Sequence, residues 1–442
     1  MNPEIIIDQY LSRYSPDVFN AFLNRLSAEL NLLANPSRPI PISRAPLLLE
    51  ERYLHQFQRA VTLIWDVLHL TAYQEITARN IPRQLRIGND EIRSIPFDSS
   101  SNIGCVDFHL YQGKLKIIEF MALPPGMAAI YPGLLARYGE FLADMIPGFG
   151  PVSFAEGWTR ERCEELMIDQ IRGKATAGIV AIIDWNPTAQ ITYGEFLYLQ
   201  QLIEKTPHGL TCVIADPREV ALRGNTPWIR GLPVDRILNR VTLVDWIHNL
   251  EKIPDYSRLL WESPEVFVYH PYLWYLADKA SLILVSDPET ISLLGFPENL
   301  VQELTELVPL TRALSDFADP KTGRLRVPSL IDHFGSPDAM VLKPVSSHAS
   351  KGVLYGPLDF PSEEKLAESL LAIDPAEYVV MKRIPPGETP YPTGQGRSET
   401  WRYDLRAYVF NDRMLFAGGR VYLGAYTNQL PTREFAPLFF VS

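Results

Sequence analysis

Two segments of the chain, far apart in the sequence, carry side chains that could do chemistry together. In the first, Lys343 ends an apolar stretch, and residues 346–352 then contain three serines, a lysine and a glycine. Small residues let backbone N–H groups approach a phosphate closely, and a lysine supplies a positive charge for its oxygens. We therefore expect a phosphate-binding loop, although the sequence pattern of the P-loop is absent. The alternative is a solvated turn that follows a strand.

The second segment, residues 106–120, alternates apolar and polar residues on both sides of Gln112-Gly113. This pattern predicts a β-hairpin. Asp107 and Glu119 would then face each other on adjacent strands, within reach of one cation. Carboxylate oxygens are the ligands that Mg²⁺ prefers in proteins. The alternative is an ordinary acidic face that is exposed to solvent.

A third candidate is Arg420, which ends an expected strand after Gly418-Gly419. Two glycines leave room for a ligand beside the chain, and the planar guanidinium suits a phosphate or a transition-state oxyanion. Asp404 and Arg406 alternate on the neighbouring expected strand. They could equally form a surface ion pair, which would contribute little to stability.

Composition restricts the class of protein. A length of 442 residues suggests two or three domains at about 150 residues each. The formal net charge is −11 without a basic stripe, so nucleic acid is not an expected partner. Three cysteines without CxxC spacing argue against disulfides and structural zinc, and fit a reducing cytoplasm. Residues 1–4 lack the basic region that begins a signal peptide, and no apolar run reaches the length of about 20 residues that spans a bilayer, so we expect a cytoplasmic protein without a membrane partner.

Apolar periodicity divides the chain into four expected regions. Residues 1–90 form an N-terminal helical region, with helices expected at 4–33 and 48–71. Residues 91–175 hold the hairpin, and residues 331–442 hold further strands. The strands expected in this last region lie at 339–344, 378–384, 403–410 and 413–421 and near Phe439. Asn411-Asp412 is expected to form the turn of a second hairpin.

Residues 176–330 alternate strands and helices, which is typical of an α/β unit with a parallel sheet. The strands are expected at 178–184, 210–216 and 234–240. Ligands bind at the carboxyl ends of such strands. Asp184, Asp216 and Arg240 are therefore candidates for substrate binding. The aromatic-rich stretch at 256–275 favours helix packing over a substrate cage.

The order of these features resembles the ATP-grasp ligases, in the circularly permuted form of the synthetase half of glutathionylspermidine synthase. Those enzymes carry a carboxylate metal motif early in the chain and their phosphate and adenine elements late. Asp107 and Glu119 match the metal motif in type and in spacing. The other segments that carry the resemblance are Asp278-Lys279-Ala280, Lys343, 346–352, Tyr378–Pro385, Gly418–Val421, Thr427-Asn428 and Phe435–Pro437.

The resemblance implies α/β plus α+β architecture, a permuted ATP-grasp fold with a pre-ATP-grasp parallel-sheet domain and N-terminal helices. It implies ATP and Mg²⁺ as cofactors, with Lys343 and Arg420 as catalytic residues. The implied nucleotide-binding residues are Lys279, Lys343, Ser346, Ser347, Ser350, Lys351, Gly352, Lys382, Arg383 and Ile384. The implied metal ligands are Asp107, Glu119 and Asn428.

The chain departs from the family pattern in three respects. Met121 stands where the metal motif has an asparagine, and a methionine cannot bind Mg²⁺ through oxygen. Cys105 stands where an arginine is expected, and Met381-Lys382 replaces the usual Gln-Glu of the adenine hinge. The metal site is therefore expected to use Asn428 or to be weaker. The substrate is expected to differ from that of the glutathionyl enzymes.

These observations predict an ATP-dependent ligase that forms a C–N bond. It would phosphorylate a carboxylate or enol-like oxygen of a small molecule, couple it to an amine or amino acid, and release ADP and phosphate. ATP-grasp enzymes of similar length also act in small natural-product pathways, and one candidate for this chain is the ligase that joins glycine to a cyclohexenone core in mycosporine biosynthesis. These enzymes are often dimers, so a homodimer is one expected assembly.

Three alternatives stay open at this point. A phosphotransferase would stop at the phosphorylated product and need no amine. A nucleotide-binding protein that has lost catalysis would show no magnesium-dependent ATP turnover, and Met121 and Cys105 favour this alternative. An unrelated α/β protein with a coincidental set of motifs would not be stabilised by ATP or ADP.

Overall fold

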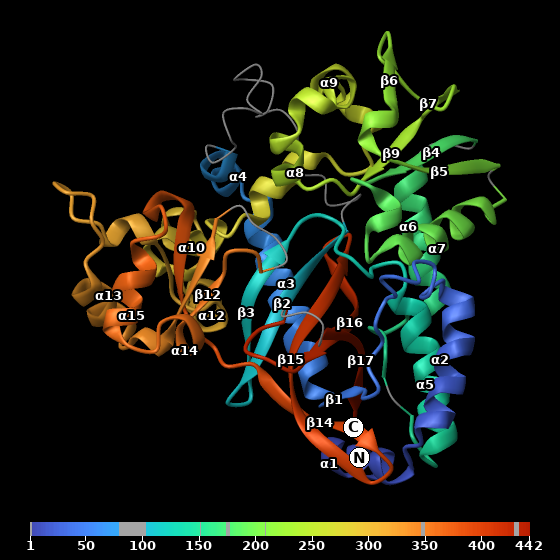
Figure 1. The fold of residues 1–442 in the computed structure, drawn as a ribbon, viewed down its shortest axis with the longest axis horizontal. Coiled ribbons are helices and arrows are strands. Elements are labelled where there is room, and N and C mark those ends of the chain that lie inside the picture. Colours follow the sequence, from blue (N-terminus) through green and yellow to red (C-terminus); the bar gives the residue numbers. More distant parts are fainter. Residues whose placement is uncertain are drawn as a thin grey trace.

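The computed structural model describes residues 2–78, 103–150, 152–173, 177–207, 209–345, 350–427 and 433–442. Its centre is a seven-stranded sheet with the order β1-β17-β16-β15-β2-β3, in which β14 also pairs with β15 (Figure 1). The strands are β1 (Leu47–Glu50), β2 (Ile103–Tyr111), β3 (Lys114–Met121), β14 (Gly387–Gly394), β15 (Arg397–Phe410), β16 (Arg413–Tyr422) and β17 (Arg433–Val441). The two ends of the chain therefore meet in one sheet.

The predicted hairpin is confirmed as β2 and β3. Gln112 and Gly113 both have positive φ angles, 50° and 73°, as a two-residue hairpin turn of type I′ requires. Asp107 is paired with Glu119, and Phe108 is paired with Ile117, so the intervening Ile118 forms a β-bulge. The hairpin turn predicted between β15 and β16 is confirmed in the same way.

The N-terminal helices differ from the prediction in two places. The helix expected at 4–33 is two helices, α1 (Pro3–Arg13) and α2 (Pro16–Leu30). Ser15 has φ −128° and ψ 126°, because a residue before proline is disfavoured in the helical region. The helix expected at 48–71 begins later, as α3 (Arg52–His69), because residues 47–50 form β1 parallel to β17. A shorter helix, α4 (Thr71–Ala78), follows.

Helices cover both faces of the central sheet. On one face, Phe57 of α3 packs against Phe108 and Phe440, with ring centroids 4.9 and 5.9 Å apart. On the other face, Tyr138 of α5 (Tyr131–Met145) packs against Phe439. Successive residues of a strand point to opposite faces. Asp107, the neighbour of Phe108, therefore points to the α5 face.

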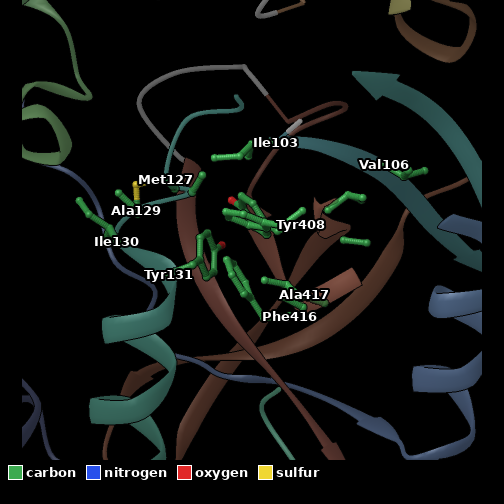
Figure 2. Close-up of a cluster of buried hydrophobic side chains, with 14 of the residues drawn as sticks. Ile103, Val106, Met127, Ala129, Ile130, Tyr131, Tyr408, Phe416 and Ala417 are labelled. Atoms are coloured by element: carbon green, nitrogen blue, oxygen red, sulfur yellow. The ribbon is translucent and has the colours of Figure 1, made fainter. Parts of the chain in front are cut away.

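An aromatic cluster fills the α5 face at one end of β15 and β16. Figure 2 shows Tyr131 beside Tyr408 and Phe416, and the centroids of Tyr131 and Tyr408 are 4.9 Å apart. The hydroxyl of Tyr131 donates to the carbonyl oxygens of Gly419 at 2.7 Å and Ala436 at 3.2 Å. These bonds fix the start of α5 against the strand that carries Arg420.

The predicted α/β unit is confirmed as a parallel sheet of β5 (Leu210–Ala215), β4 (Gly178–Ile183) and β9 (Arg236–Asn239), in that order. Helices α6 (Arg160–Arg172) and α7 (Tyr193–Glu204) pack beside it (Figure 1). A small antiparallel sheet follows, of β6 (Val220–Arg223), β7 (Thr226–Ile229) and β8 (Leu232–Pro233). The helices that come next are α8 (Leu243–His248), α9 (Pro254–Glu262), α10 (Ser281–Ser286), α11 (Pro288–Leu293) and α12 (Glu298–Leu307).

The fourth sheet has the order β10-β13-β11-β12. Its strands are β10 (Thr311–Ala313), β11 (Met340–Pro344), β12 (Leu354–Tyr355) and β13 (Tyr378–Lys382), and its helices are α13 (Val327–Phe334), α14 (Gly356–Asp359) and α15 (Glu363–Leu370). A hydrophobic core separate from the main one lies here, made of Leu314, Phe317, Leu330, Phe334, Met340, Leu342, Phe360, Leu366, Leu370 and Val380. We call this part of the chain, residues 310–384, the small unit.

The architecture is thus mixed α/β, with parallel and antiparallel sheets in one chain. Strand β1 comes from the predicted region 1–90, and it lies in the same sheet as β17 from the predicted region 331–442. The region boundaries at 90, 175 and 330 stay predictions. In the described part of the chain, each helix is too short or too polar to cross a membrane.

Candidate functional site

A cavity of about 400 Å³ lies where the central sheet, the small unit and the α/β unit come together. The central sheet contributes Asp107, His109, Glu119, Asp404, Arg406 and Arg420. The small unit contributes Lys343, Ser350, Tyr355, Met381 and Lys382, followed by Arg383 and Ile384. The remaining wall includes Gln190, Ile191, Thr192, Arg240, Trp274 and Lys279.

The floor of the cavity is a row of charged side chains that crosses four strands. Asp107 of β2 is paired with Glu119 of β3 on one side and with Arg406 of β15 on the other. Asp404 of β15 is paired with Arg420 of β16. Residues two apart on a strand share a face, so the register places all five on the α5 face of the sheet.

Salt bridges connect these side chains into one network. Arg406 donates from Nε and Nη2 to the two oxygens of Asp107, at 2.6 and 2.7 Å. Arg420 donates from Nη2 to Asp107 and to Asp404, both at 2.8 Å, and from Nε to Asp404 at 3.0 Å. The hydroxyl of Thr427 also donates to Asp404. Burial opposes ionisation of Asp107, but the two arginines outweigh it and lower the pKa of Asp107 to about 2.

The sequence alternative of a surface ion pair between Asp404 and Arg406 is wrong. Both side chains are almost completely buried, with 1% and 12% of their surface exposed. Each has its ion pair on a neighbouring strand, Asp404 with Arg420 and Arg406 with Asp107. The reason is the pairing of β15 with β2 and β16, which places an opposite charge across from each of them.

Two lysines approach the same floor from other elements. Lys279 Nζ lies 3.3 Å from Glu119 Oε1. Lys343, at the end of β11, donates at 2.9 Å to the carbonyl oxygen of Ile118, the bulged residue of β3. Burial lowers the pKa of Lys343 to about 8, although Glu119 acts in the opposite direction. The predicted pair of phosphate-binding lysines is thus brought to one edge of the hairpin.

The predicted adenine hinge also lines the cavity, through Met381, Lys382, Arg383 and Ile384. The carbonyl oxygen of Ile384 accepts a hydrogen bond from His109 Nδ1 at 2.7 Å, which ties the hinge to β2. Arg383 donates to the carbonyl oxygen of Asp338 at 2.5 Å and to the hydroxyl of Tyr355 at 3.1 Å. These contacts hold the segment after β13 in place above the floor.

Of the predicted phosphate loop, residues 346–352, the structure describes residues 350–352. Ser350 lines the cavity and has a positive φ of 58°. Lys351 and Gly352 are exposed and lie outside the cavity wall, and Tyr378 donates from its hydroxyl to the carbonyl oxygen of Gly352 at 3.1 Å. Ser346 and Ser347 lie outside the described residues.

Two of the three predicted metal ligands, Asp107 and Glu119, line the cavity, and the magnesium site itself stays a prediction. Asp107 and Glu119 are cross-strand neighbours, but both oxygens of Asp107 already accept bonds from arginines. Asn428 lies outside the described residues. Within the described ranges, no cluster of three or more histidine, cysteine, aspartate or glutamate side chains could hold a metal ion. Glu119 is the predicted ligand that stays accessible, with 35% of its side chain exposed.

The three substrate candidates of the α/β unit have different positions. Arg240 lines the cavity and donates to the carbonyl oxygens of Pro124 and Pro125. Asp216 is held by Arg218, with 2.7 Å between Oδ1 and Nε, and lies outside the cavity wall. Asp184 also lies outside it, and burial raises the pKa of Asp184 to about 7, against the charge of Arg240.

The charge of the lining favours an anionic ligand. The cavity is lined by eight lysine and arginine side chains and four carboxylates, a balance of 8 − 4 = +4, in a chain whose formal net charge is −11. The cations are Lys279, Lys343, Lys382, Arg240, Arg383, Arg406, Arg420 and Arg433, and the carboxylates are Asp107, Glu119, Asp278 and Asp404. Such focusing of one sign of charge raises the local concentration of oppositely charged ligands.

Two groups of lining residues were missed from the sequence. The alternation of Asp404 and Arg406 on one expected strand drew attention to Arg406. The sequence did not show which strand lies beside it, so its contact with Asp107 was missed. Gln190, Ile191, Thr192 and Tyr355 had no signal, since loop positions and isolated aromatics carry no periodic pattern.

Comparisons with known proteins bear on the fold. No protein-family model matches this chain, and no curated protein matches it in sequence. A glutathione synthetase-like effector from Globodera pallida in its apo form matches in structure with a TM-score of 0.59 and 11% identity, over 100% of this chain and 98% of that one. A γ-glutamylcysteine synthetase-like protein from Methylobacillus flagellatus KT matches with a TM-score of 0.39 and 14% identity, over 84% of this chain and 88% of that one. The first match shows that the fold of this chain is similar to that of the effector over nearly the full length of both.

Proposed function

We propose that this chain is an ATP-dependent ligase that phosphorylates a carboxylate or enol-like oxygen of a small molecule and couples it to an amine. The observation that carries the proposal is the convergence of Lys279 and Lys343 on one edge of the β2–β3 hairpin, beside Arg406 and Arg420. Four cations from separate elements suit the linked phosphates of a nucleotide. The glutathione synthetase-like fold is consistent with this class of enzyme.

The lining suggests where each part of the reactants would bind. The phosphate chain would lie over Lys279, Lys343 and the two arginines. The base would lie beside Met381 and the following hinge residues, between the small unit and the central sheet. The opposite wall, with Arg240, would hold the acid and the amine.

The chemistry requires two successive displacements. An oxygen of the acid attacks the γ-phosphorus of ATP, and ADP leaves with the electrons of the broken P–O bond. The amine nitrogen then attacks the activated carbon, phosphate leaves, and the amine loses a proton. The protein would contribute orientation and charge neutralisation, which are the main sources of rate acceleration in phosphoryl transfer. The mycosporine coupling stays a prediction from the sequence, because the likeness to the effector concerns the fold and not the substrate.

A second candidate is a protein that binds nucleotide without turning it over. Two observations favour it, the thioether of Met121 beside the predicted metal site and the salt bridges that occupy Asp107. A phosphotransferase would differ from a ligase by needing no amine. Both alternatives share the nucleotide site, so the nucleotide is tested first.

The first test is thermal unfolding and calorimetry with ADP and a non-hydrolysable ATP analogue. A ligand at 100 times its dissociation constant stabilises the folded state by about 2.7 kcal/mol. We expect Lys343→Ala to weaken ADP binding about 10- to 100-fold, because a hydrogen bond to a charged group contributes about 1.5–3 kcal/mol. Lys365→Ala is the matched control, since Lys365 is an exposed lysine of α15 whose partner is Glu368.

Nucleotide that neither stabilises the wild-type chain nor binds to it would contradict the proposed function. If nucleotide binds, the formation of ADP and of free phosphate is then measured from ATP with pairs of acids and amines. Free phosphate that appears only when both reactants are present supports the ligase. ADP and a phosphorylated acid formed without free phosphate and without an amine support the phosphotransferase, and binding without ADP formation supports the second candidate.

A further inference from the structure

The oxygens of Asp107 are occupied by guanidinium groups. A carboxylate offers about four lone-pair positions, and Asp107 uses three of them for Arg406 and Arg420. Magnesium needs ligands at about 2.0–2.1 Å in a near-octahedral shell. The bidentate contact of Arg406 therefore lies across the positions from which a metal ion would bind Asp107.

Side-chain exposure shows which charges a ligand in the cavity would meet. Asp107 and Asp404 have 3% and 1% of their side-chain surface exposed, whereas Arg406 and Arg420 have 12% and 13%. All four side chains line the cavity, and the guanidinium groups expose more of their surface than the carboxylates do. A phosphate on this floor would therefore meet fixed cations first.

On the described strands of the hairpin, Met121 and Cys105 supply no oxygen ligand for Mg²⁺. Met121 follows Glu119 at the next position of the same face, and it is paired with the buried Cys105. Thioether and thiol sulfurs suit soft metals and not magnesium. Glu119 remains as the accessible carboxylate of the hairpin, and one carboxylate is a sufficient protein ligand for one Mg²⁺ that phosphates also bind.

We propose that Arg406 and Arg420 take the place of a metal ion at Asp107, so that this site neutralises a phosphate chain with fixed guanidinium groups and takes up at most one divalent cation, at Glu119. The proposal rests on the proposed nucleotide site. It makes Arg406 a phosphate-binding residue, and it makes Asp107 the residue that positions Arg406. It predicts that ADP binds to this chain when divalent cations are removed.

The first experiment counts manganese. Mn²⁺ replaces Mg²⁺ in such sites, and the free ion is measured by electron paramagnetic resonance in the presence of saturating ADP. In the wild-type chain we expect no more than one bound Mn²⁺ per chain. We expect the same number in Asp107→Asn. In Glu119→Gln we expect only the Mn²⁺ that ADP itself binds in solution. Two Mn²⁺ per chain, with one lost in Asp107→Asn, would overturn the proposal.

The second experiment measures ADP affinity by calorimetry in EDTA and in Mg²⁺. We expect the wild-type affinity to change less than about threefold between the two, which corresponds to less than about 0.7 kcal/mol. Arg406→Met should bind ADP at least about tenfold more weakly in EDTA and regain affinity in Mg²⁺, because Asp107 then becomes able to bind an ion. Arg406→Lys keeps the positive charge, and it should therefore still bind ADP in EDTA.

The controls distinguish a failure of the proposed nucleotide site from a failure of the inference about Arg406 and Asp107. A purely structural role for Arg406 would lower the affinity equally in EDTA and in Mg²⁺, and this result would contradict our assignment. If Arg406→Met fails to fold, the number of Mn²⁺ ions bound to the wild-type chain still shows whether a second ion binds beside the one at Glu119. Absence of ADP binding under every condition would overturn the proposed function itself, whereas binding that depends on two metal ions would overturn this inference alone.

Discussion

At the scale of single residues, the protonation of Lys343 links the site to pH. Its amino group donates to the carbonyl oxygen of Ile118, and burial lowers its pKa to about 8. The charge is therefore present at neutral pH and lost as the pH rises through 8. Because the unfolded lysine has a pKa of about 10.4, the unfolded state binds more protons between pH 8 and pH 10, and this residue makes the free energy of unfolding increase with pH in that window.

This titration gives a prediction for ligand binding. The affinity for ADP should decrease as the pH rises from 7 to 9, because the lysine loses its charge beside the phosphates. Calorimetric titrations across this range measure the effect. Lys343→Arg, whose guanidinium stays charged, should keep its affinity over the same range. The same pH profile in the arginine variant and in the wild-type chain would contradict the assignment.

A second titration is predicted for Asp184. Burial raises its folded pKa to about 7, whereas an unfolded aspartate has a pKa of about 3.9. The folded state thus binds more protons between pH 4 and pH 7, and this residue lowers the free energy of unfolding as the pH rises through that window. Asp184→Asn should be more stable than the wild type at pH 8, and the difference should vanish at pH 4. Urea unfolding at both pH values measures this, and Asp169→Asn, on an exposed surface of α6, is the control.

Residue types and local spacing singled out Lys343, Glu119 and Arg420, and the family resemblance added Lys279. All four side chains line the same cavity. Residue types and spacing were not sufficient for the role of Arg406, because its partner Asp107 lies 299 residues away in the sequence. Which carboxylate an arginine contacts depends on strand order. A single sequence shows alternation within a strand, but it does not show which distant strand lies beside it.

At the scale of elements, the contact between α5 and the central sheet depends on a glycine. A Cβ atom added at Gly418 of β16 would lie 2.2 Å from the ring of Tyr131. Gly139 lies in α5 itself, and a Cβ there would meet Phe439 at an ordinary distance of 3.5 Å. The two glycines therefore form a matched pair on one interface.

We expect Gly418→Ala to lower the free energy of unfolding by about 1–3 kcal/mol, as overpacking in a core does. Gly139→Ala should leave stability unchanged or raise it by up to about 1 kcal/mol, because alanine is the better helix former. Urea unfolding of both variants measures the difference. Equal stability of the two would mean that Tyr131 moves aside without cost, and that α5 is not held as described.

The elements that were predicted poorly from the sequence are those that pair with a strand far away in the sequence. The strand at residues 47–50 has the same apolar character as the start of a helix, and its partner β17 lies at the other end of the chain. The break at Ser15 was readable from Pro16, since proline restricts the preceding residue. Both hairpins were located correctly because their turn residues adopt positive φ, which is a local property.

At the scale of the whole molecule, the cavity lies between two hydrophobic cores. The small unit has its own core, and Lys343, Tyr355 and Met381 reach the cavity from it. Arg406 and Arg420 belong to the central sheet, which shares the larger core. A ligand in the cavity would contact both parts of the chain at once, and it would oppose the opening of either part.

Hydrogen exchange measured by mass spectrometry tests this coupling. Without ligand, we expect amides of β11 and β13 to exchange faster than those of β15 and β16, because the smaller core buries less apolar surface and opens at a lower free energy. Saturating ADP should slow exchange in β11 and β13, since opening of the small unit would then require loss of the ligand. Strands β6 and β7, which lie away from the cavity wall, are the internal control and should be unaffected. Slowing confined to β15 and β16 would show that ADP binds to the central sheet alone, and the small unit would then have no part in holding the nucleotide.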